Sequence, residues 1–500
     1  MKPSILFCAV AAFLVSAATA QPQATSPEQL ARYIDTYLKQ PDYENAIWAA
    51  YITDLNTGEV LYERNHKLSL MPASNAKLFT TAASLDQLGP GFTYTTIGYA
   101  DGPIENGILK GNLYIRGSGD PVIGGRFNQG DITRTFREWA DTLRSMGIYA
   151  IEGDLIGDDD IFEDTPFGPG WSWDDEPYDY GAEMSGLSFN DNSVNVIMTG
   201  SVAGRPAQMH WEPGNTSYVQ LLNAAVIIPS DQRKDEEIER PRASNSFVIS
   251  TELPAGRLDT TGLAVANPTL YFVHVLRDVL QSNRIEVRGQ AVDVDDLPVK
   301  PDYTRAEMTP LLSHTSPPLR DIVKVINKES QNLYAELVLR TLGVVHPVAD
   351  PDVEPGSTEM GVMSALYTYA RAGVDTSRIQ LVDGSGLSRM NLVTAQMLDR
   401  VLRYMWHHPD NAIRLAFLNS LPIGGVDGSL ERRMRTGPAM GNARAKTGTL
   451  TGTSNLSGYV TSAGGTPLSF VLFCNNHTLR AREIHRTQDA IVQLLARYTR

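Results

Sequence analysis

The chain has 500 residues, a length that predicts two or three domains, and its 42% hydrophobic and 20% charged residues are typical of a globular protein. Its formal net charge of −14 argues against nucleic acids and anionic membrane surfaces as partners. The acidic residues are spread along the chain and do not form a tail.

The first 20 residues have the pattern of a secretory signal peptide. Lys2 precedes an apolar run from Ile5 to Val15, and Ala18-Thr19-Ala20 predicts cleavage after Ala20. The alternative is a membrane anchor, but the run is too short to span a bilayer comfortably, so no transmembrane anchor is expected after cleavage. Cleavage leaves Cys474 as the only cysteine. An exported chain without an intrachain disulfide fits the periplasm of a bacterial cell envelope.

The elements expected before residue 92 are a helix, a hairpin and a second helix. Ser26 and Pro27 have the residue types that begin a helix. Strands are predicted at 47–54 and 59–64, joined by a turn at Asn56-Thr57-Gly58. The second helix starts near Ser74 and buries a stripe formed by Leu78, Ala82 and Leu85.

From residue 92 to residue 262, short strand-like runs alternate with turns, which predicts a β-rich insertion of one or two subdomains. Residues 263–500 then contain several helices, a strand pair at 455–461 and 468–474, and a closing helix. Residues 21–91 and 263–500 are therefore expected to form one split domain. Its fold class is α/β (α+β), with an antiparallel sheet flanked by helices on both sides.

Three short motifs carry the chemistry. Ser74 and Lys77 are three residues apart on a predicted helix, so the amine can lie beside the hydroxyl and accept its proton. Ser330-Gln331-Asn332 and Lys446-Thr447-Gly448 follow in that order. Taken singly, each motif is weak, because Ser330 could simply cap a helix and Lys446-Thr447-Gly448 could be a strand-end turn. Together they match the signature of penicillin-binding proteins and serine β-lactamases.

From about Ala46 to the C-terminus, the chain resembles the low-molecular-mass class C penicillin-binding proteins, DacB-like D-alanyl-D-alanine carboxypeptidase/endopeptidases. That resemblance implies a penicillin-binding/β-lactamase-like transpeptidase fold, with a large insertion between the first two motifs. The stretches that carry it are PASNAKLFT (72–80), GNLYIRGSGDP (111–121), GDLIGDDDIF (153–162), WSWDDEP (171–177), SGLSFNDN (185–192), KESQNLYAE (328–336), VDGSGLSRMN (382–391) and AKTGTLTGTSNLSGYV (445–460).

The resemblance also implies a role for each motif residue. Ser74 would be the nucleophile and Lys77 its base, and Ser330 would relay a proton to the leaving amine. Asn332 would position the substrate amide, while Lys446 and Thr447 would hold the terminal carboxylate. In the family the oxyanion is bound by two backbone N–H groups, which here would come from Ser74 and from Thr449, after Gly448.

Two further substrate contacts are weaker expectations. Asp174 or Asp175 would bind the amine of a diaminopimelate side chain, and Arg389 would flank the same pocket. The alternatives are a solvated turn for the aspartates and a structural ion pair for Arg389.

Neither a metal nor a cofactor is expected. The nine histidines show no zinc-binding spacing, and His407-His408 is interpreted as the exposed end of a helix. Asp158-Asp159-Asp160 lacks the alternating spacing of a calcium loop and is interpreted as a solvated turn.

The leading functional hypothesis is hydrolysis of D-Ala-D-Ala termini, of peptidoglycan cross-links or of both, with β-lactams as covalent inhibitors. A serine β-lactamase and a non-catalytic scaffold that binds stem peptides are the alternatives. The sequence leaves open the balance of carboxypeptidase and endopeptidase activity, and it leaves open whether the protein forms a homo-oligomer.

Overall fold

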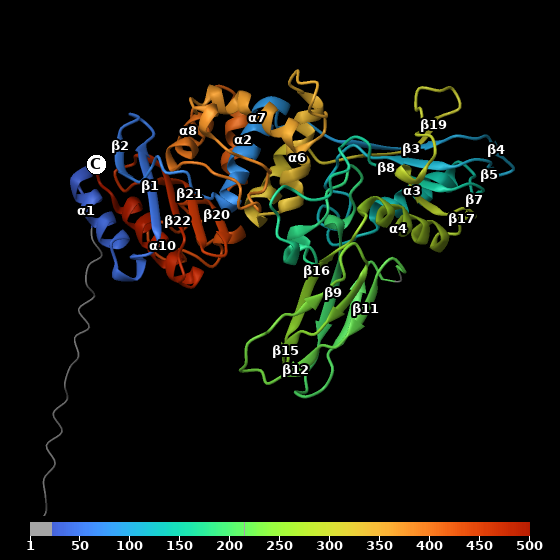
Figure 1. The fold of residues 1–500 in the computed structure, drawn as a ribbon, viewed down its shortest axis with the longest axis horizontal. Coiled ribbons are helices and arrows are strands. Elements are labelled where there is room, and N and C mark those ends of the chain that lie inside the picture. Colours follow the sequence, from blue (N-terminus) through green and yellow to red (C-terminus); the bar gives the residue numbers. More distant parts are fainter. Residues whose placement is uncertain (1–22, 215) are drawn as a thin grey trace, which may run out of the picture.

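The computed structural model describes residues 23–214 and 216–500, so the predicted signal peptide, residues 1–20, lies outside the described residues. A five-stranded antiparallel sheet is built from the two ends of the chain, in the order β2-β1-β22-β21-β20 (Figure 1). This confirms the predicted sheet. Its strands are β1 (Ile47–Asp54), β2 (Val60–Arg64), β20 (Arg444–Leu450), β21 (Thr453–Thr461) and β22 (Pro467–Asn475).

The two faces of this sheet are covered by different helices because alternate strand residues point to opposite sides. In β1, Trp48, Ala50 and Ile52 join one hydrophobic cluster, and Ala49 and Tyr51 join another. The first cluster contains residues of α1 (Pro27–Leu38) and α10 (Ala481–Arg497). The second contains residues of α2 (Ala76–Leu88), α5 (Leu319–Lys324), α6 (Asn332–Val345), α7 (Thr358–Arg371), α8 (Ala395–Trp406) and α9 (Asn411–Ser420). No helix in the described ranges has the length and apolar content needed to cross a membrane.

The insertion has its own hydrophobic core between two sheets and two helices, α3 (Arg134–Ser145) and α4 (Pro268–Ser282). The larger sheet has the order β18-β8-β6-β3-β19, and the smaller has the order β17-β7-β5-β4. Their strands are β3 (Thr95–Ala100), β4 (Ile104–Glu105), β5 (Ile108–Leu109), β6 (Leu113–Arg116), β7 (Ala150–Ile151), β8 (Leu155–Asp158), β17 (Glu286–Val287), β18 (Ala291–Asp293) and β19 (Thr309–Thr315).

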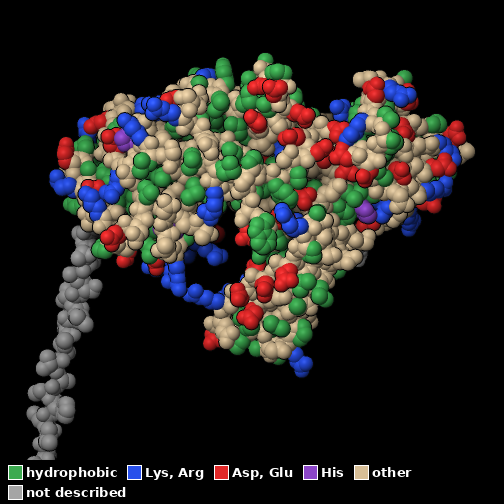
Figure 2. Space-filling view, in the orientation of Figure 1, with side chains coloured by type: hydrophobic (Ala, Val, Ile, Leu, Met, Phe, Trp, Pro, Cys, Tyr) green, Lys and Arg blue, Asp and Glu red, His purple; other side chains and the backbone are tan. Residues whose placement is uncertain are grey.

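A β-rich arm projects from the insertion, and Figure 2 shows a hollow between this arm and the split domain on the face in view. The arm contains three small sheets. They are formed by β9 (Ser193–Thr199), β10 (Gln208–Glu212) and β16 (Leu258–Ala264); by β11 (Gln220–Asn223), β13 (Ile238–Glu239) and β14 (Ser246–Ile249); and by β12 (Val226–Ile228) and β15 (Glu252–Pro254).

The insertion extends further along the chain than the expected boundary at residue 262. Strand β19 pairs with β3, and β17 and β18 pair in parallel with β7 and β8, so the strands of residues 263–315 belong to the sheets of the insertion. The sequence boundary was misplaced because β17 and β18 are only two and three residues long. Strands this short carry no alternating pattern, and their partners lie far away in sequence.

Candidate active site

Ser74 lies in a tight turn directly before α2. The turn is a single 3₁₀ turn, Ala73–Asn75, and Ala73 has a left-handed backbone with φ of 47°. The side chain of Asn455, on β21, donates hydrogen bonds to the carbonyl oxygens of Met71 (2.9 Å) and Pro72 (2.7 Å). The sheet therefore holds the segment that presents the Ser74 hydroxyl.

Lys77 is the second residue of α2, three residues after Ser74, and its Nζ is 3.1 Å from Ser74 Oγ, as this spacing predicts. Its side chain is fully buried. The amine also donates to Asn332 Oδ1 (2.6 Å) and to the Ser385 carbonyl (2.8 Å). Burial lowers the pKa of Lys77 to about 7, against the opposing negative charges of Glu336 and Asp383. A substantial fraction of Lys77 is thus neutral near neutral pH and able to accept a proton.

Ser330 is held in a left-handed conformation, with φ of 65° and ψ of 32°, between a π-helical turn (Val325–Glu329) and α6. The alternative that Ser330 caps the following helix is wrong, because the Gln331 side chain accepts the hydrogen bond from Leu333 N (2.8 Å). Asn332 joins the site through Lys77 and donates its Nδ2 to the Tyr180 carbonyl (2.8 Å).

Lys446 reaches Ser330 from β20, the outer strand of the sheet. Its Nζ donates to Ser330 Oγ (2.8 Å) and to the Thr447 carbonyl (2.9 Å). Burial, and then the charge of Lys77, lower the pKa of Lys446. The pKa of Lys77, in contrast, is lowered by burial alone.

Two neighbours of Lys446 also belong to the site. The hydroxyls of Thr447 and Ser429 lie 2.9 Å apart. Gly448 passes close to the turn that holds Ser74, where a Cβ would lie 2.8 Å from Asn75 Nδ2 and 2.9 Å from the Pro72 carbonyl oxygen. The lack of a side chain at Gly448 therefore lets β20 approach Ser74.

Sequence reasoning missed two buried carboxylates that shape the segment 382–391. Glu336 accepts hydrogen bonds from Gly384 N (2.8 Å) and Ser385 N (2.7 Å). Asp383 accepts from the Trp171 indole (3.0 Å) and from the groups Gly386 N, Ser388 N and Asn391 Nδ2. Burial raises the pKa of both carboxyls. A usable signal for Glu336 was a lone acid in the otherwise apolar run of α6.

A cleft of about 470 Å³ opens beside Ser74 and brings most of the candidate residues together. Asp174, Asp175 and Arg389 are among its lining residues, and Asp174 is exposed in a 3₁₀ turn. Asp175 accepts from the Tyr180 hydroxyl (3.0 Å), and Arg389 donates to the Thr451 carbonyl (3.1 Å) rather than to an acid. The other candidate residues that line the cleft are Ser74, Ser330, Asn332 and Thr449. Lys446 lies behind Ser330, at hydrogen-bond distance from its hydroxyl.

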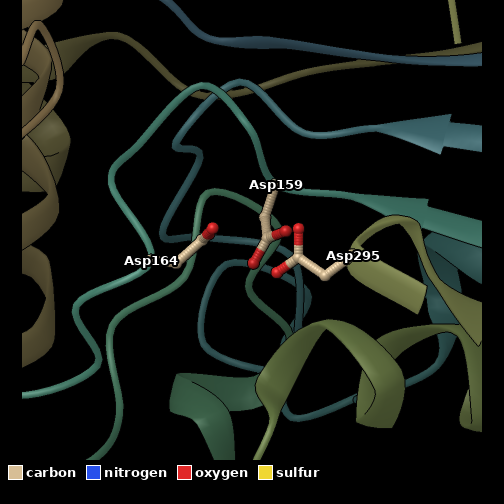
Figure 3. A group of neighbouring side chains, drawn as sticks. All are labelled: Asp159, Asp164 and Asp295. Atoms are coloured by element: carbon tan, nitrogen blue, oxygen red, sulfur yellow. The ribbon is translucent and has the colours of Figure 1, made fainter. Parts of the chain in front are cut away.

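The acidic segment at 158–160 differs from its interpretation as a solvated turn. Asp158 is only 4% exposed and accepts a hydrogen bond from Tyr303. Figure 3 shows the carboxylates of Asp159, Asp164 and Asp295 pointing toward one another within the insertion. Burial, with the nearby acids, raises the pKa of Asp159 to about 7. An acidic cluster alone does not define a metal site, and we assign none.

The histidine pair at 407–408 is only partly the exposed helix end that was expected. His407 follows α8 and is exposed, whereas His408 is 7% exposed. Its Nε2 lies 3.0 Å from a carboxylate oxygen of Asp86. Asp86, on α2, also accepts hydrogen bonds from Thr368 on α7 and Tyr404 on α8. The contact of His408 with Asp86 therefore belongs to a structural network between helices.

This fold and these motifs define an enzyme of the penicillin-binding and β-lactamase-like class, with a serine and a lysine on one helix facing Lys-Thr-Gly on a sheet edge. The chain belongs to the D-Ala-D-Ala carboxypeptidase 3 (S13) family, whose model matches residues 30–498. It is therefore a peptidase of the D-Ala-D-Ala carboxypeptidase type.

Individual relatives agree with this assignment. A D-alanyl-D-alanine carboxypeptidase of Actinomadura sp. (strain R39) is 33% identical over 483 residues, which cover 94% of this chain and 85% of the relative. The crystal structure of penicillin binding protein 4 (dacB) from Haemophilus influenzae matches with a TM-score of 0.78 at 24% identity, covering 94% of this chain and 99% of the other. A second structure of that protein, complexed with a novel β-lactam, matches with a TM-score of 0.72 at 23% identity and the same coverage.

Proposed function

We propose that the protein hydrolyses the D-Ala-D-Ala bond of peptidoglycan stem peptides, and the equivalent bond of cross-links, through an acyl-serine intermediate. The observation that carries this proposal is the 3.1 Å separation of Ser74 Oγ and the buried Lys77 Nζ. Ser74 Oγ attacks the carbonyl of the penultimate D-alanine while its proton passes to Lys77. The resulting tetrahedral intermediate is stabilised by the backbone N–H groups of Ser74 and Thr449.

The leaving amine then takes a proton from the Ser330 hydroxyl, and the C–N bond breaks. Lys446 replaces the proton of Ser330, because its Nζ donates to Ser330 Oγ at 2.8 Å. A water molecule then attacks the acyl-serine ester: one water proton passes to Lys446, the hydroxyl joins the acyl carbon, and Lys77 returns its proton to Ser74 Oγ as the ester C–O bond breaks. Asn332, which already contacts Lys77, positions the substrate amide.

Lys446 and Thr447 bind the terminal carboxylate of the substrate. In the free enzyme, burial and Lys77 lower the pKa of Lys446. The bound substrate carboxylate is an opposite charge beside Lys446, so substrate binding raises the pKa of Lys446 and favours its ammonium form. In a cross-link the carboxylate belongs to a longer leaving strand. The same residues therefore serve carboxypeptidase and endopeptidase reactions.

The cleft wall selects the side chain of the stem peptide. Asp174 or Asp175 binds the ammonium group of a diamino acid, and Arg389 binds the carboxylate beside it. The family match favours this peptidase over a β-lactamase or a non-catalytic scaffold. We place the enzyme in the periplasm, because its first 20 residues have the pattern of an export signal.

Intact-protein mass spectrometry with penicillin tests the nucleophile. We expect one drug-sized adduct on the wild-type protein and none on Ser74→Ala, together with release of D-alanine from a D-Ala-D-Ala peptide by the wild-type protein alone. A folded wild-type protein that gains no adduct at any drug concentration or time would contradict the acyl-serine mechanism. An adduct that persists in Ser74→Ala would assign the nucleophile to another residue.

A further inference from the structure

Both sequence neighbours of Ser330 are held by residues of the insertion. The Arg126 guanidinium forms ion pairs with Glu329 and with Asp191. Gln331 Nε2 donates to the same carboxylate oxygen of Asp191, at 3.2 Å. Arg126 and Asp191, which we call the Ser330 clasp, thus connect residues 329 and 331 on either side of the proton-relaying serine.

The backbone that presents Asp191 is strained. Asn190, Asp191 and Asn192 are three consecutive residues with left-handed backbones, at φ of 48°, 55° and 52°. This conformation is uncommon for residues other than glycine, although asparagine and aspartate tolerate it better than most. Asn190 and Asn192 donate to the carbonyls of Ser193 (2.9 Å) and Glu183 (2.8 Å), which hold the turn. The carboxylate of Asp191 reaches out to Arg126 and Gln331 instead.

Ser330 needs such support, because a left-handed serine is itself an uncommon conformation. A one-residue change from that conformation would turn its Oγ away from Lys446. The clasp is effective because its charges are partly shielded from solvent: the side chains of Arg126 and Asp191 are 31% and 16% exposed. The guanidinium also lies 5.9 Å above the Tyr334 ring.

We propose that Arg126 and Asp191 are positioning residues that hold Ser330 where its hydroxyl passes a proton to the leaving amine. This inference rests on the proposed function, in which Ser330 is that proton donor. The insertion therefore contributes to proton transfer as well as to the cleft wall, although neither clasp residue touches the reacting atoms.

The test compares two substrates that differ in their need for a proton. An amide releases an amine that must be protonated, whereas a thioester of the same acyl group releases a thiol with a pKa near that of cysteine, about 8.5, which leaves as thiolate. We expect Arg126→Met to lower kcat/KM for the amide about tenfold or more, and to change kcat/KM for the thioester by less than about threefold. Ser330→Ala, measured alongside, gives the change in kcat/KM for each substrate when the proton donor itself is removed.

Two more variants serve as a second probe of the clasp and as a matched control. Asp191→Asn keeps a residue that tolerates the left-handed backbone but removes the ion pair. Like Arg126→Met, it should lower kcat/KM for the amide much more than kcat/KM for the thioester. Arg137→Met removes an exposed ion pair with Asp131 elsewhere in the insertion and should leave both values unchanged. Thermal melting confirms that each variant is folded. If Arg126→Met does not fold, Asp191→Asn carries the test with the same criteria.

The outcomes separate this inference from the proposed function. If the clasp variants lost kcat/KM equally on the amide and the thioester, or lost it on neither, the positioning role would be overturned while the peptidase activity stood. Equal loss in Ser330→Ala would overturn it as well, because Ser330 would then not be the proton donor. A wild-type protein inactive on both substrates would reject the proposed function itself.

Discussion

Lys77 is the residue whose protonation state should set the pH dependence of acylation. As the proposed base it would accept the Ser74 proton only when neutral, and burial lowers its pKa to about 7. We expect kcat/KM, and the rate of acylation by penicillin, to rise with pH and to level off above an apparent pKa near 7. Below that pKa the rate should fall about tenfold for each pH unit, as expected when one proton must be lost. A rate that stays constant well below pH 7 would contradict Lys77 as the base.

Glu336 supplies the control for this assignment, because burial raises the pKa of its carboxyl toward the range in which Lys77 titrates. Its negative charge raises the pKa of Lys77. Glu336→Gln should therefore shift the rise of kcat/KM with pH to lower pH and leave the slope of that rise unchanged. Disappearance of this rise in Glu336→Gln would instead identify Glu336 as the group that titrates.

At the residue scale, contacts within one turn of a helix could be predicted from the sequence alone. Contacts between motifs far apart in the chain could be predicted only from the family resemblance. The Ser74–Lys77 contact follows from helical spacing alone. The links from Lys77 to Ser385 and from Lys446 to Ser330 join distant segments, and only the resemblance brought those motifs into one site. The lone acid in α6 marks Glu336 as unusual, but its hydrogen bonds to residues 384 and 385 and its effect on the pKa of Lys77 arise only once the fold brings these segments together.

Among the elements, the segment 382–391 matters because it packs directly on the turn that presents Ser74. Gly386 has φ of 82°, and a Cβ there would lie 1.9 Å from the Ala73 carbonyl oxygen, next to the nucleophile. We expect Gly386→Ala to displace that turn and to slow acylation by penicillin about tenfold or more, since small misplacements of reacting groups are costly. Stopped-flow or quenched mass spectrometry measures this rate.

Gly373 provides a matched control for the backbone effect. Its φ of 79° is nearly the same, yet a Cβ there would meet nothing within 4 Å. Gly373→Ala should cost roughly 1 kcal/mol of stability for the left-handed backbone and leave acylation unchanged. If both variants slowed acylation equally, global destabilisation rather than the contact with Ala73 would be the cause.

The elements themselves were largely predictable where each carries its own local signal. Ser26 accepts a hydrogen bond from Gln29 N at the start of α1, as the residue types at that helix start predict. The hairpins β1–β2 and β21–β22 follow from strand-like runs on either side of a turn. Strands β17 and β18 were missed because they are defined by pairing with distant strands and not by any pattern of their own.

For the whole molecule, the residues that line the cleft are divided between the split domain and the insertion. Ser74, Lys77 and Lys446 come from segments that belong to the five-stranded sheet and its helices, whereas the cleft wall around Asp174 comes from the insertion. Composition predicted that an insertion exists, but it could not place residues 172–175 beside Arg389. That arrangement depends on how the insertion packs against the split domain.

This separation leads to a prediction about specificity. Asp174→Asn should lower kcat/KM about fivefold for a D-Ala-D-Ala peptide whose side chain ends in a free ammonium group, the size expected for an exposed ion pair. Asp174 is exposed at the cleft rim, so the loss should shrink as salt is added. The same variant should react normally with penicillin and with a peptide whose side-chain amine is acetylated. Asp131→Asn, an exposed acid of the insertion outside this cleft, should leave all three reactions unchanged.

The contrast between substrates makes this prediction decisive, because Asp174 also accepts a hydrogen bond from Ser172 within its own turn. A purely structural role would disturb the whole cleft wall and slow the free and acetylated peptides alike. If Asp174→Asn is neutral and Asp175→Asn shows the selective loss, the ammonium group is bound by Asp175, which also faces the cleft. If neither variant discriminates between the two peptides, the insertion does not recognise the side-chain ammonium, and recognition must come from the split domain alone.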